Sequence, residues 1–347
     1  MKQSVRLIGN NILPNVSPKH KNLFRFGIAA FSLTPFSSLN SNARMIVENE
    51  STAFSKVYRL VSNQKILDNF PRLLRVSNLV NKDSLVNVDF STFCGFETLA
   101  FGLQTNLGRA IPIWNNCITY PISEVGSQNT FVVSEIKALG EVLGFYPSFV
   151  FDRGFWIPDM IKFFLKENII FYLRIKAGKL LELDQGDSEG GKTTKTAFKI
   201  GKFTKDANLN LYEHRLRLII SPPPKPKNCK SKERWYILTN DFKSSREKVL
   251  ETYKHRFEIE ETFKDLKHVC DLKKFFIKKK LTFKILLMFA CLAFWISYWC
   301  FQLTQLGVST LYTLTHPKKK KSYFRIWWES IQRQTRKPLL NLLIPDG

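Results

Sequence analysis

The stretch from Leu85 to Ile175 constrains the fold of this chain more than any other part of its sequence. Three short segments rich in β-forming residues come first, and two helical patterns that alternate with two apolar strands follow. This order predicts a mixed α/β sheet with flanking helices. The strands are expected at 85–90, 98–103, 111–120, 149–151 and 169–175, and the helices at 135–143 and 158–167.

The rest of the chain divides into regions that differ in composition and residue pattern. The N-terminal region is basic, and the helical spacing of its apolar residues from Phe54 to Val80 predicts two short helices broken at Pro71. A later stretch alternates like antiparallel hairpins, which predicts a β-rich insertion in the α/β core. The expected regions are a candidate DNA-binding N-terminal region over 1–80, a core over 81–177 and 241–305, the insertion over 178–240 and a basic C-terminal tail over 306–347.

Charge indicates the class of partner. Lys and Arg number 53 against 29 Asp and Glu, and the formal net charge is +24. Such an excess favours an anionic partner, which is nucleic acid or, less often, an anionic membrane surface. The 30 Phe and 7 Trp exclude a chain disordered along its whole length. Six scattered cysteines without a CxxC pair, and no signal-peptide pattern, indicate reduced thiols in a cytoplasmic protein.

Two aspartates stand where predicted strands end. Asp89 closes the first apolar strand, and Asp152 follows the short strand 149–151. Functional groups of α/β proteins gather at the carboxyl ends of strands, so both are candidate catalytic residues. The alternative for either residue alone is an ordinary turn, because Asp commonly ends a strand.

A helix predicted over 244–267 carries four polar residues on one face: Tyr253, Arg256, Glu260 and Lys267. At ~100° per residue, their spacing places them within a sector of about 60°. A solvated charged stripe is the alternative, although a tyrosine among the charges argues against it. The apolar residues available for the buried side of this helix are Phe257, Phe263 and Leu266.

The spacing Tyr253-x2-Arg256-x3-Glu260-x6-Lys267 resembles the signature of bacterial insertion-sequence DDE transposases. Asp89 resembles the first catalytic aspartate of that family. Asp152, which begins the sequence Asp-Arg-Gly-Phe, resembles the second. The segment Trp235-x3-Thr239-Asn240 is similar to the strand before the signature helix. The resemblance covers about residues 80–305 and implies a ribonuclease H-like fold with a β-rich insertion between the second Asp and the Glu.

The resemblance also implies an activity, which is DNA cleavage and strand transfer at the ends of an insertion sequence. Its cofactors would be two Mg²⁺ ions, for which Mn²⁺ can substitute, held by the carboxylates of Asp89, Asp152 and Glu260. Its partners would be the transposon ends and the target DNA, bound by a homodimer, and we expect no small-molecule substrate. Its location would be the bacterial cytoplasm, at the nucleoid.

Five residues are candidate DNA contacts by the same resemblance. Arg256 and Lys267 would contact phosphates, and Tyr253 would contact or orient the same strand. Arg153 follows the second aspartate and is a further candidate. Trp235 is a candidate for stacking on an extruded base, as in relatives that cleave through a DNA hairpin, and ordinary core packing is its alternative.

Other patterns in the sequence have competing interpretations. Residues 186–193 match the P-loop spacing, but the segment after them alternates like a strand where a P-loop needs a helix. Residues 285–315 carry no charge, and we prefer a buried helix there to a membrane span over 285–303. Family members usually begin with a helical domain for terminal-repeat DNA, which residues 1–80 match weakly. A catalytically decayed DNA-binding remnant is therefore an alternative function, and a basic membrane protein is a further one.

Overall fold

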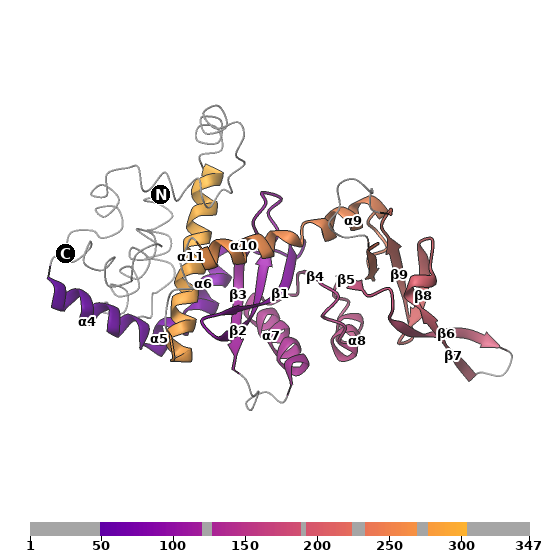
Figure 1. Ribbon diagram of the computed structural model, residues 1–347, viewed down its shortest axis with the longest axis horizontal. Coiled ribbons are helices and arrows are strands. Elements are labelled where there is room, and N and C mark those ends of the chain that lie inside the picture. The colour runs from indigo at the N-terminus through magenta and orange to yellow at the C-terminus, as the bar shows by residue number, and fades with distance from the viewer. Residues whose placement is uncertain (1–48, 120–126, 189–191, 224–232, 269–276, 304–347) are drawn as a thin grey trace. The chain divides into compact units, whose positions relative to one another are not determined.

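The computed structural model describes residues 49–119, 127–188, 192–223, 233–268 and 277–303, and Figure 1 traces its elements along the chain. Contacts divide the chain into two compact units. The first unit is 1–80, 90–123 and 258–347, and the second unit is 81–89 and 124–257. The tail expected over 306–347 lies outside the described residues.

The first unit combines an antiparallel hairpin with helices. Strands β2 (Phe96–Leu103) and β3 (Ile111–Ile118) pair with each other, and helix α11 (Lys280–Leu303) packs on β3. Trp295 of α11 donates its indole N–H to the carbonyl of Pro112 over 2.7 Å. The remaining helices of this unit are α4 (Glu50–Val61), α5 (Gln64–Leu67), α6 (Phe70–Ser77) and α10 (Phe257–His268).

The second unit contains the parallel part of the sheet. The first half of β1 (Leu85–Phe93) pairs in parallel with β4 (Ser148–Phe151), which pairs in parallel with β5 (Phe171–Ile175). Phe164 of α8 (Pro158–Lys166) stacks on Phe149 of β4 at 5.6 Å between ring centroids. Helix α7 (Gln128–Leu143) begins at a Ser127 cap, which is earlier than expected.

The insertion contributes two hairpins. Strands β8 (Ala207–Leu211) and β9 (His214–Ile220) extend the main sheet through β10 (Tyr236–Thr239), which pairs antiparallel with β5. Strands β6 (Leu180–Ser188) and β7 (Lys192–Lys199) form a separate two-stranded sheet. β7 stands where a P-loop would need a helix, which rules out the P-loop.

Strand β1 is continuous across the boundary between the two units. The hydrogen-bonded strand order is therefore β3-β2-β1-β4-β5-β10-β9-β8. The predicted mixed α/β sheet with flanking helices is confirmed. Strands β2 and β3 are antiparallel, and the strands reached through α7 and α8 pair in parallel, because a parallel connection needs a crossover.

Two helix predictions are wrong in detail. The N-terminal region has three helices from residue 50 to residue 77, and Pro71 lies in the first turn of α6 instead of between helices. Proline fits that position because its missing N–H has no helical partner there. The single helix expected over 244–267 is two helices, α9 (Arg246–Lys254) and α10, because the chain turns at His255 and Arg256.

The uncharged segment near the C-terminus forms α11. Among the described residues α11 is the helix long and apolar enough to cross a membrane, and 78% of its most apolar stretch is buried. Its side chains from Ile285 to Ser297 are almost wholly inaccessible to solvent. This burial favours the expected core helix over a membrane span.

Candidate active site

Asp89 and Asp152 lie at neighbouring positions on adjacent parallel strands. Val88 of β1 is the register partner of Phe151 of β4, and each aspartate follows its member of this pair. Neighbouring strands are ~4.8 Å apart, so the two carboxylates share one edge of the sheet. β1 continues to Phe93, so Asp89 lies within that strand, where its pairing with β4 stops, and not at its end.

Arg256 is buried and pairs with Asp89. Its Nη1 atom lies 3.3 Å from the Asp89 Oδ2 atom, and its side chain is 4% exposed. The guanidinium also lies over the rings of Tyr253 and Phe257, at 5.8 and 4.9 Å from their centroids. The structure thus directs Arg256 toward a candidate catalytic carboxylate instead of outward into solvent.

The turn that holds Arg256 is fixed to β1 by a second contact. The Asn87 side-chain amide donates to the carbonyl of His255 over 3.1 Å. In a continuous helix that carbonyl would accept from the N–H of Ile259, so the contact accounts for the break between α9 and α10. Sequence reasoning missed Asn87, a fully buried polar residue in an apolar strand.

Tyr253 is fully buried, and its hydroxyl donates to the Oδ1 atom of Asp152 over 3.2 Å. Burial raises the pKa of Tyr253 to about 12; the charge of Asp152 adds to the effect, while those of Arg256 and Arg174 oppose it. The hydroxyl is therefore protonated at neutral pH and acts as a donor. The ring belongs to the core cluster of the second unit, not to an exposed helix face.

Asp152 also faces a cluster of charges that sequence reasoning missed. Arg174 Nη1 lies 4.0 Å from Asp152, and Arg174 Nη2 lies 3.0 Å from Glu233. Glu233 accepts a second contact from Arg153 over 2.9 Å. A single arginine in the apolar strand β5 is the signal that could have identified Arg174, because an unpaired charge rarely occupies such a strand.

Trp235 packs against the core cluster of the second unit, to which Tyr253 belongs. Its ring lies edge-on to Tyr253 at 5.1 Å and tilted to Phe257 at 6.5 Å. These contacts favour the core-packing interpretation of Trp235. Phe257 is 43% exposed, so its expected place on the buried side is wrong, whereas Phe263 and Leu266 are buried as expected.

Glu260 and Lys267 belong to α10 in the first unit. Glu260 is half-buried, and Lys267 Nζ lies 5.1 Å from the Phe93 ring centroid. Other acidic side chains of α10 fix this helix to the rest of the first unit. Glu258 accepts from the backbone N–H groups of Thr105 and Gly108, and Asp265 and Glu261 both pair with Arg109.

The candidate ligands suit a hard cation. Two half-exposed carboxylates at one sheet edge provide oxygen donors of the kind that Mg²⁺ prefers. Within the described part of the chain, no group of three or more His, Cys, Asp and Glu side chains lies close enough to hold a metal. Asp89 and Asp152 belong to the second unit and Glu260 to the first.

Comparison with known proteins finds a similar family. Residues 132–296 match the family model of the transposase DDE domain. This part of the chain is therefore similar to a transposase DDE domain. Its mixed sheet with flanking helices is similar to the ribonuclease H-like fold of transposases. The match includes Asp152 and the whole signature from Tyr253 to Lys267, and Asp89 precedes it.

The chain was also compared with curated proteins and with solved structures. No curated protein matches the sequence significantly. Among solved structures, the chain is similar to a piggyBac transposase in a synaptic complex with hairpin DNA, with a TM-score of 0.48 and 12% identity. That similarity covers 100% of this chain and 81% of the other.

Proposed function

We propose that this transposase cleaves DNA at the ends of its own insertion sequence and joins the ends to a target in a reaction that requires Mg²⁺. The observation that carries the proposal is the placement of Asp89 and Asp152 directly after the register pair Val88 and Phe151. Two carboxylates at one sheet edge, in a domain of the DDE family, support a metal-dependent phosphoryl transfer.

Asp89, Asp152 and Glu260 are the proposed ligands of two Mg²⁺ ions, with Mn²⁺ as a substitute. When bound, such ions supply an activated nucleophile and stabilise the leaving oxygen. The signature spacing supports the third ligand, because Glu260 stands four positions after Arg256, and Arg256 itself contacts Asp89.

Tyr253 and Arg256 act in this proposal as positioning residues. The Tyr253 hydroxyl restricts the rotation of the Asp152 carboxylate, and the Arg256 guanidinium restricts that of Asp89. Both groups are buried, so they keep their orientation while the carboxylates face solvent. Arg256 also offsets the repulsion between two neighbouring negative charges.

The net charge of +24 supports the proposed partners, which are transposon ends and target DNA. Lys267 and Arg153 are the proposed phosphate contacts among the candidate residues. We propose a homodimer that holds paired ends, located at the nucleoid in the bacterial cytoplasm. Specific end recognition would fall to residues 1–80, most of which lie outside the described residues.

Cleavage by the purified protein tests the proposal. A supercoiled plasmid that carries the gene with its native flanking DNA is incubated with Mg²⁺, Mn²⁺ or Ca²⁺. We expect nicking or excision with Mg²⁺ and Mn²⁺, and none for Asp89→Asn or Asp152→Asn. If both variants bind DNA and cut as the wild type does, the carboxylates are not catalytic. If no version cuts, the remnant function replaces the transposase.

A further inference from the structure

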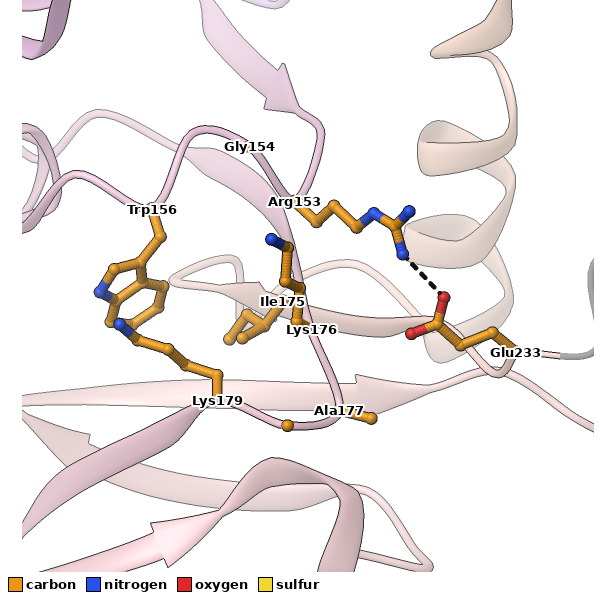
Figure 2. Close-up of a pocket in the computed structure, with 9 residues that line it drawn as sticks. Arg153, Gly154, Trp156, Ile175, Lys176, Ala177, Lys179 and Glu233 are labelled. Atoms are coloured by element: carbon orange, nitrogen blue, oxygen red, sulfur yellow. Dashed lines mark hydrogen bonds and ion pairs between the residues drawn. The ribbon is translucent and has the colours of Figure 1, made fainter.

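The three proposed ligands are held in place in different ways. In the second unit, side chains contact both aspartates directly, through Tyr253 and Arg256. Figure 2 shows a further ion pair beside them, between Arg153 and Glu233. Glu260 lies on α10 in the first unit. The direction of its carboxylate therefore depends on how α10 is attached to the rest of that unit.

Glu258, two residues before Glu260, attaches the start of α10 through both of its carboxylate oxygens. Its Oε2 atom accepts the backbone N–H of Thr105 over 2.9 Å, and its Oε1 atom accepts that of Gly108 over 3.1 Å. Its own backbone carbonyl accepts the N–H of Ala110 over 3.2 Å. The residue is only 4% exposed. A buried carboxylate is costly unless it is hydrogen-bonded, so these contacts fix its position.

The loop 105–109, which joins β2 to β3, is shaped to receive this carboxylate. The Thr105 hydroxyl donates to the carbonyl of Arg109 over 2.7 Å, which closes the loop on itself. Asn106 and Gly108 have positive φ angles of 60° and 80°. Such turns can direct several backbone N–H groups to one side and so form a concavity that binds anions. Here the carboxylate of α10 fills that role.

A second attachment lies two turns further along α10. The Arg109 Nε atom donates to the buried carboxylate of Asp265 over 2.7 Å. Glu258 and Asp265 are seven residues apart, so at ~100° per residue they project from one face of the helix, ~10 Å apart along its axis. Glu260 projects ~160° away from Glu258 by the same geometry. The loop 105–109 thus holds α10 from the side opposite to Glu260.

Close packing against the same hairpin supports these polar contacts. Ile259, directly before Glu260, is 1% exposed. A Cβ atom added to Gly102 of β2 would lie 2.8 Å from the Ala110 Cβ atom and 3.4 Å from the Ile259 side chain. The Thr262 hydroxyl donates to the carbonyl of Ala110 over 2.8 Å. The first turn of α10 is therefore held on both sides of Glu260 in the sequence.

We propose that Glu258 is a positioning residue for Glu260, and that it acts by attaching α10 to the loop 105–109. Side-chain ends lie ~5–6 Å from a helix axis, so a rotation of α10 by about 20° would move them by about 2 Å. Mg²⁺ requires its oxygen ligands at about 2.0–2.1 Å in nearly ideal octahedral geometry, and such a shift would remove a ligand. The inference rests on the proposed function, in which Glu260 is a metal ligand.

Mn²⁺ binding to the full chain tests the proposal without cleavage, through the electron paramagnetic resonance signal of the free ion. Glu258→Gln keeps the size of the side chain but places an NH₂ group where one oxygen accepts an N–H. We expect this variant to bind Mn²⁺ about 10–100-fold more weakly than the wild type, with unchanged DNA affinity in EDTA. The matched control is Glu261→Gln, which removes a charge paired with the side chains of Arg109 and Lys264. This control should bind Mn²⁺ as the wild type does.

A destabilised variant separates positioning from a general loss of stability. Trp295→Phe removes the indole N–H that donates to the carbonyl of Pro112, in the same hairpin but from α11. It should unfold at lower urea concentration than the wild type and still bind Mn²⁺ with wild-type affinity at temperatures where it is folded. Wild-type Mn²⁺ affinity in Glu258→Gln would overturn the proposal. An equal loss of affinity in Trp295→Phe and Glu258→Gln would do so as well.

A second pair of variants serves if Glu258→Gln does not fold. Thr262→Val keeps the shape of a buried side chain and removes the hydroxyl that donates to Ala110, whereas Thr262→Ser keeps a hydroxyl. We expect weaker Mn²⁺ binding in the valine variant and wild-type binding in the serine variant. Equal binding by the two variants would contradict a positioning role for this attachment.

Glu260→Gln distinguishes failure of this inference from failure of the proposed function. If Glu260→Gln binds Mn²⁺ more weakly but Glu258→Gln binds it as the wild type does, the positioning role is wrong and the proposed metal ligand stands. If Glu260→Gln itself binds Mn²⁺ with wild-type affinity, Glu260 is not a ligand, and the positioning role is overturned together with that part of the proposed function.

Discussion

The guanidinium of Arg256 lies 3.3 Å from a carboxylate oxygen of Asp89, in the turn that separates helices α9 and α10. The preceding residue, His255, is bound through its carbonyl to Asn87, two residues before Asp89. Two contacts therefore join this turn to the strand that carries the first candidate catalytic residue. The helix break and the position of Asp89 depend on each other.

Replacement of Arg256 should destabilise the fold. Arg256→Ala leaves Asp89 without this partner, and loss of one partner from a buried ion pair costs about 3–5 kcal/mol. Because the Asp89 side chain is 22% exposed, water can solvate it, and we expect the free energy of unfolding in urea to fall by about 2–3 kcal/mol. Lys254→Ala, at an exposed position of α9, is the control. A loss equal to that of the control would contradict a structural role for the pair.

Two variants of Tyr253 should separate the contribution of ring packing to stability from that of the hydrogen bond to Asp152. Tyr253→Phe keeps the buried ring and removes the hydroxyl that donates to Asp152, which should cost about 0.5–1.5 kcal/mol in unfolding free energy. Tyr253→Ala also leaves a cavity and should cost about 3–5 kcal/mol. Cleavage activity should fall in the Phe variant at temperatures where it is fully folded. Full activity there would show that the hydroxyl does not orient Asp152.

Asp241 should make stability depend on pH. Burial alone would raise the pKa of Asp241, but hydrogen bonds from Ser244, Tyr172 and Lys243 outweigh burial and hold that pKa below its usual value. A lowered pKa in the folded state stabilises the protein at pH values above the unfolded pKa, and this stability is lost as pH falls through the folded pKa. The wild type should therefore have a higher free energy of unfolding than Asp241→Asn at neutral pH, and this difference should disappear below about pH 4. A constant difference from pH 7 to pH 2, measured by urea unfolding, would contradict the lowered pKa.

DNA affinity should fall steeply with salt concentration. Each phosphate neutralised on duplex DNA contributes about −0.9 to the slope of log K against log salt. Lys267→Ala and Arg153→Ala should each reduce the slope by about 0.9 if their side chains contact phosphates. Lys264→Ala is the control, because that lysine is exposed on α10 and paired with Glu261. Unchanged slopes in the first two variants would remove them from the interface.

The sequence alone could predict those features that depend on local pattern. β-rich segments became β1 to β5, and the strand end before Asp152 followed from the local pattern. The strand end expected at Asp89 was wrong, because β1 continues to Phe93. The break between α9 and α10 could not be predicted, because Asn87, more than 160 residues earlier in the chain, captures the carbonyl of His255. The contact of Arg174 with Asp152 and Glu233 likewise depends on how β4 and β5 pair.

Excision in cells tests the central claim most directly. A plasmid that carries the gene with its native flanking DNA is assayed for precise loss of the element, and wild type is compared with Glu260→Gln and Glu261→Gln. The two variants remove the same charge from neighbouring positions of α10, but Glu261 pairs with Arg109 and Lys264. We predict Mg²⁺-dependent excision by the wild type and by Glu261→Gln, and none by Glu260→Gln. Excision by Glu260→Gln at the wild-type rate would contradict the assignment of a catalytic carboxylate to α10.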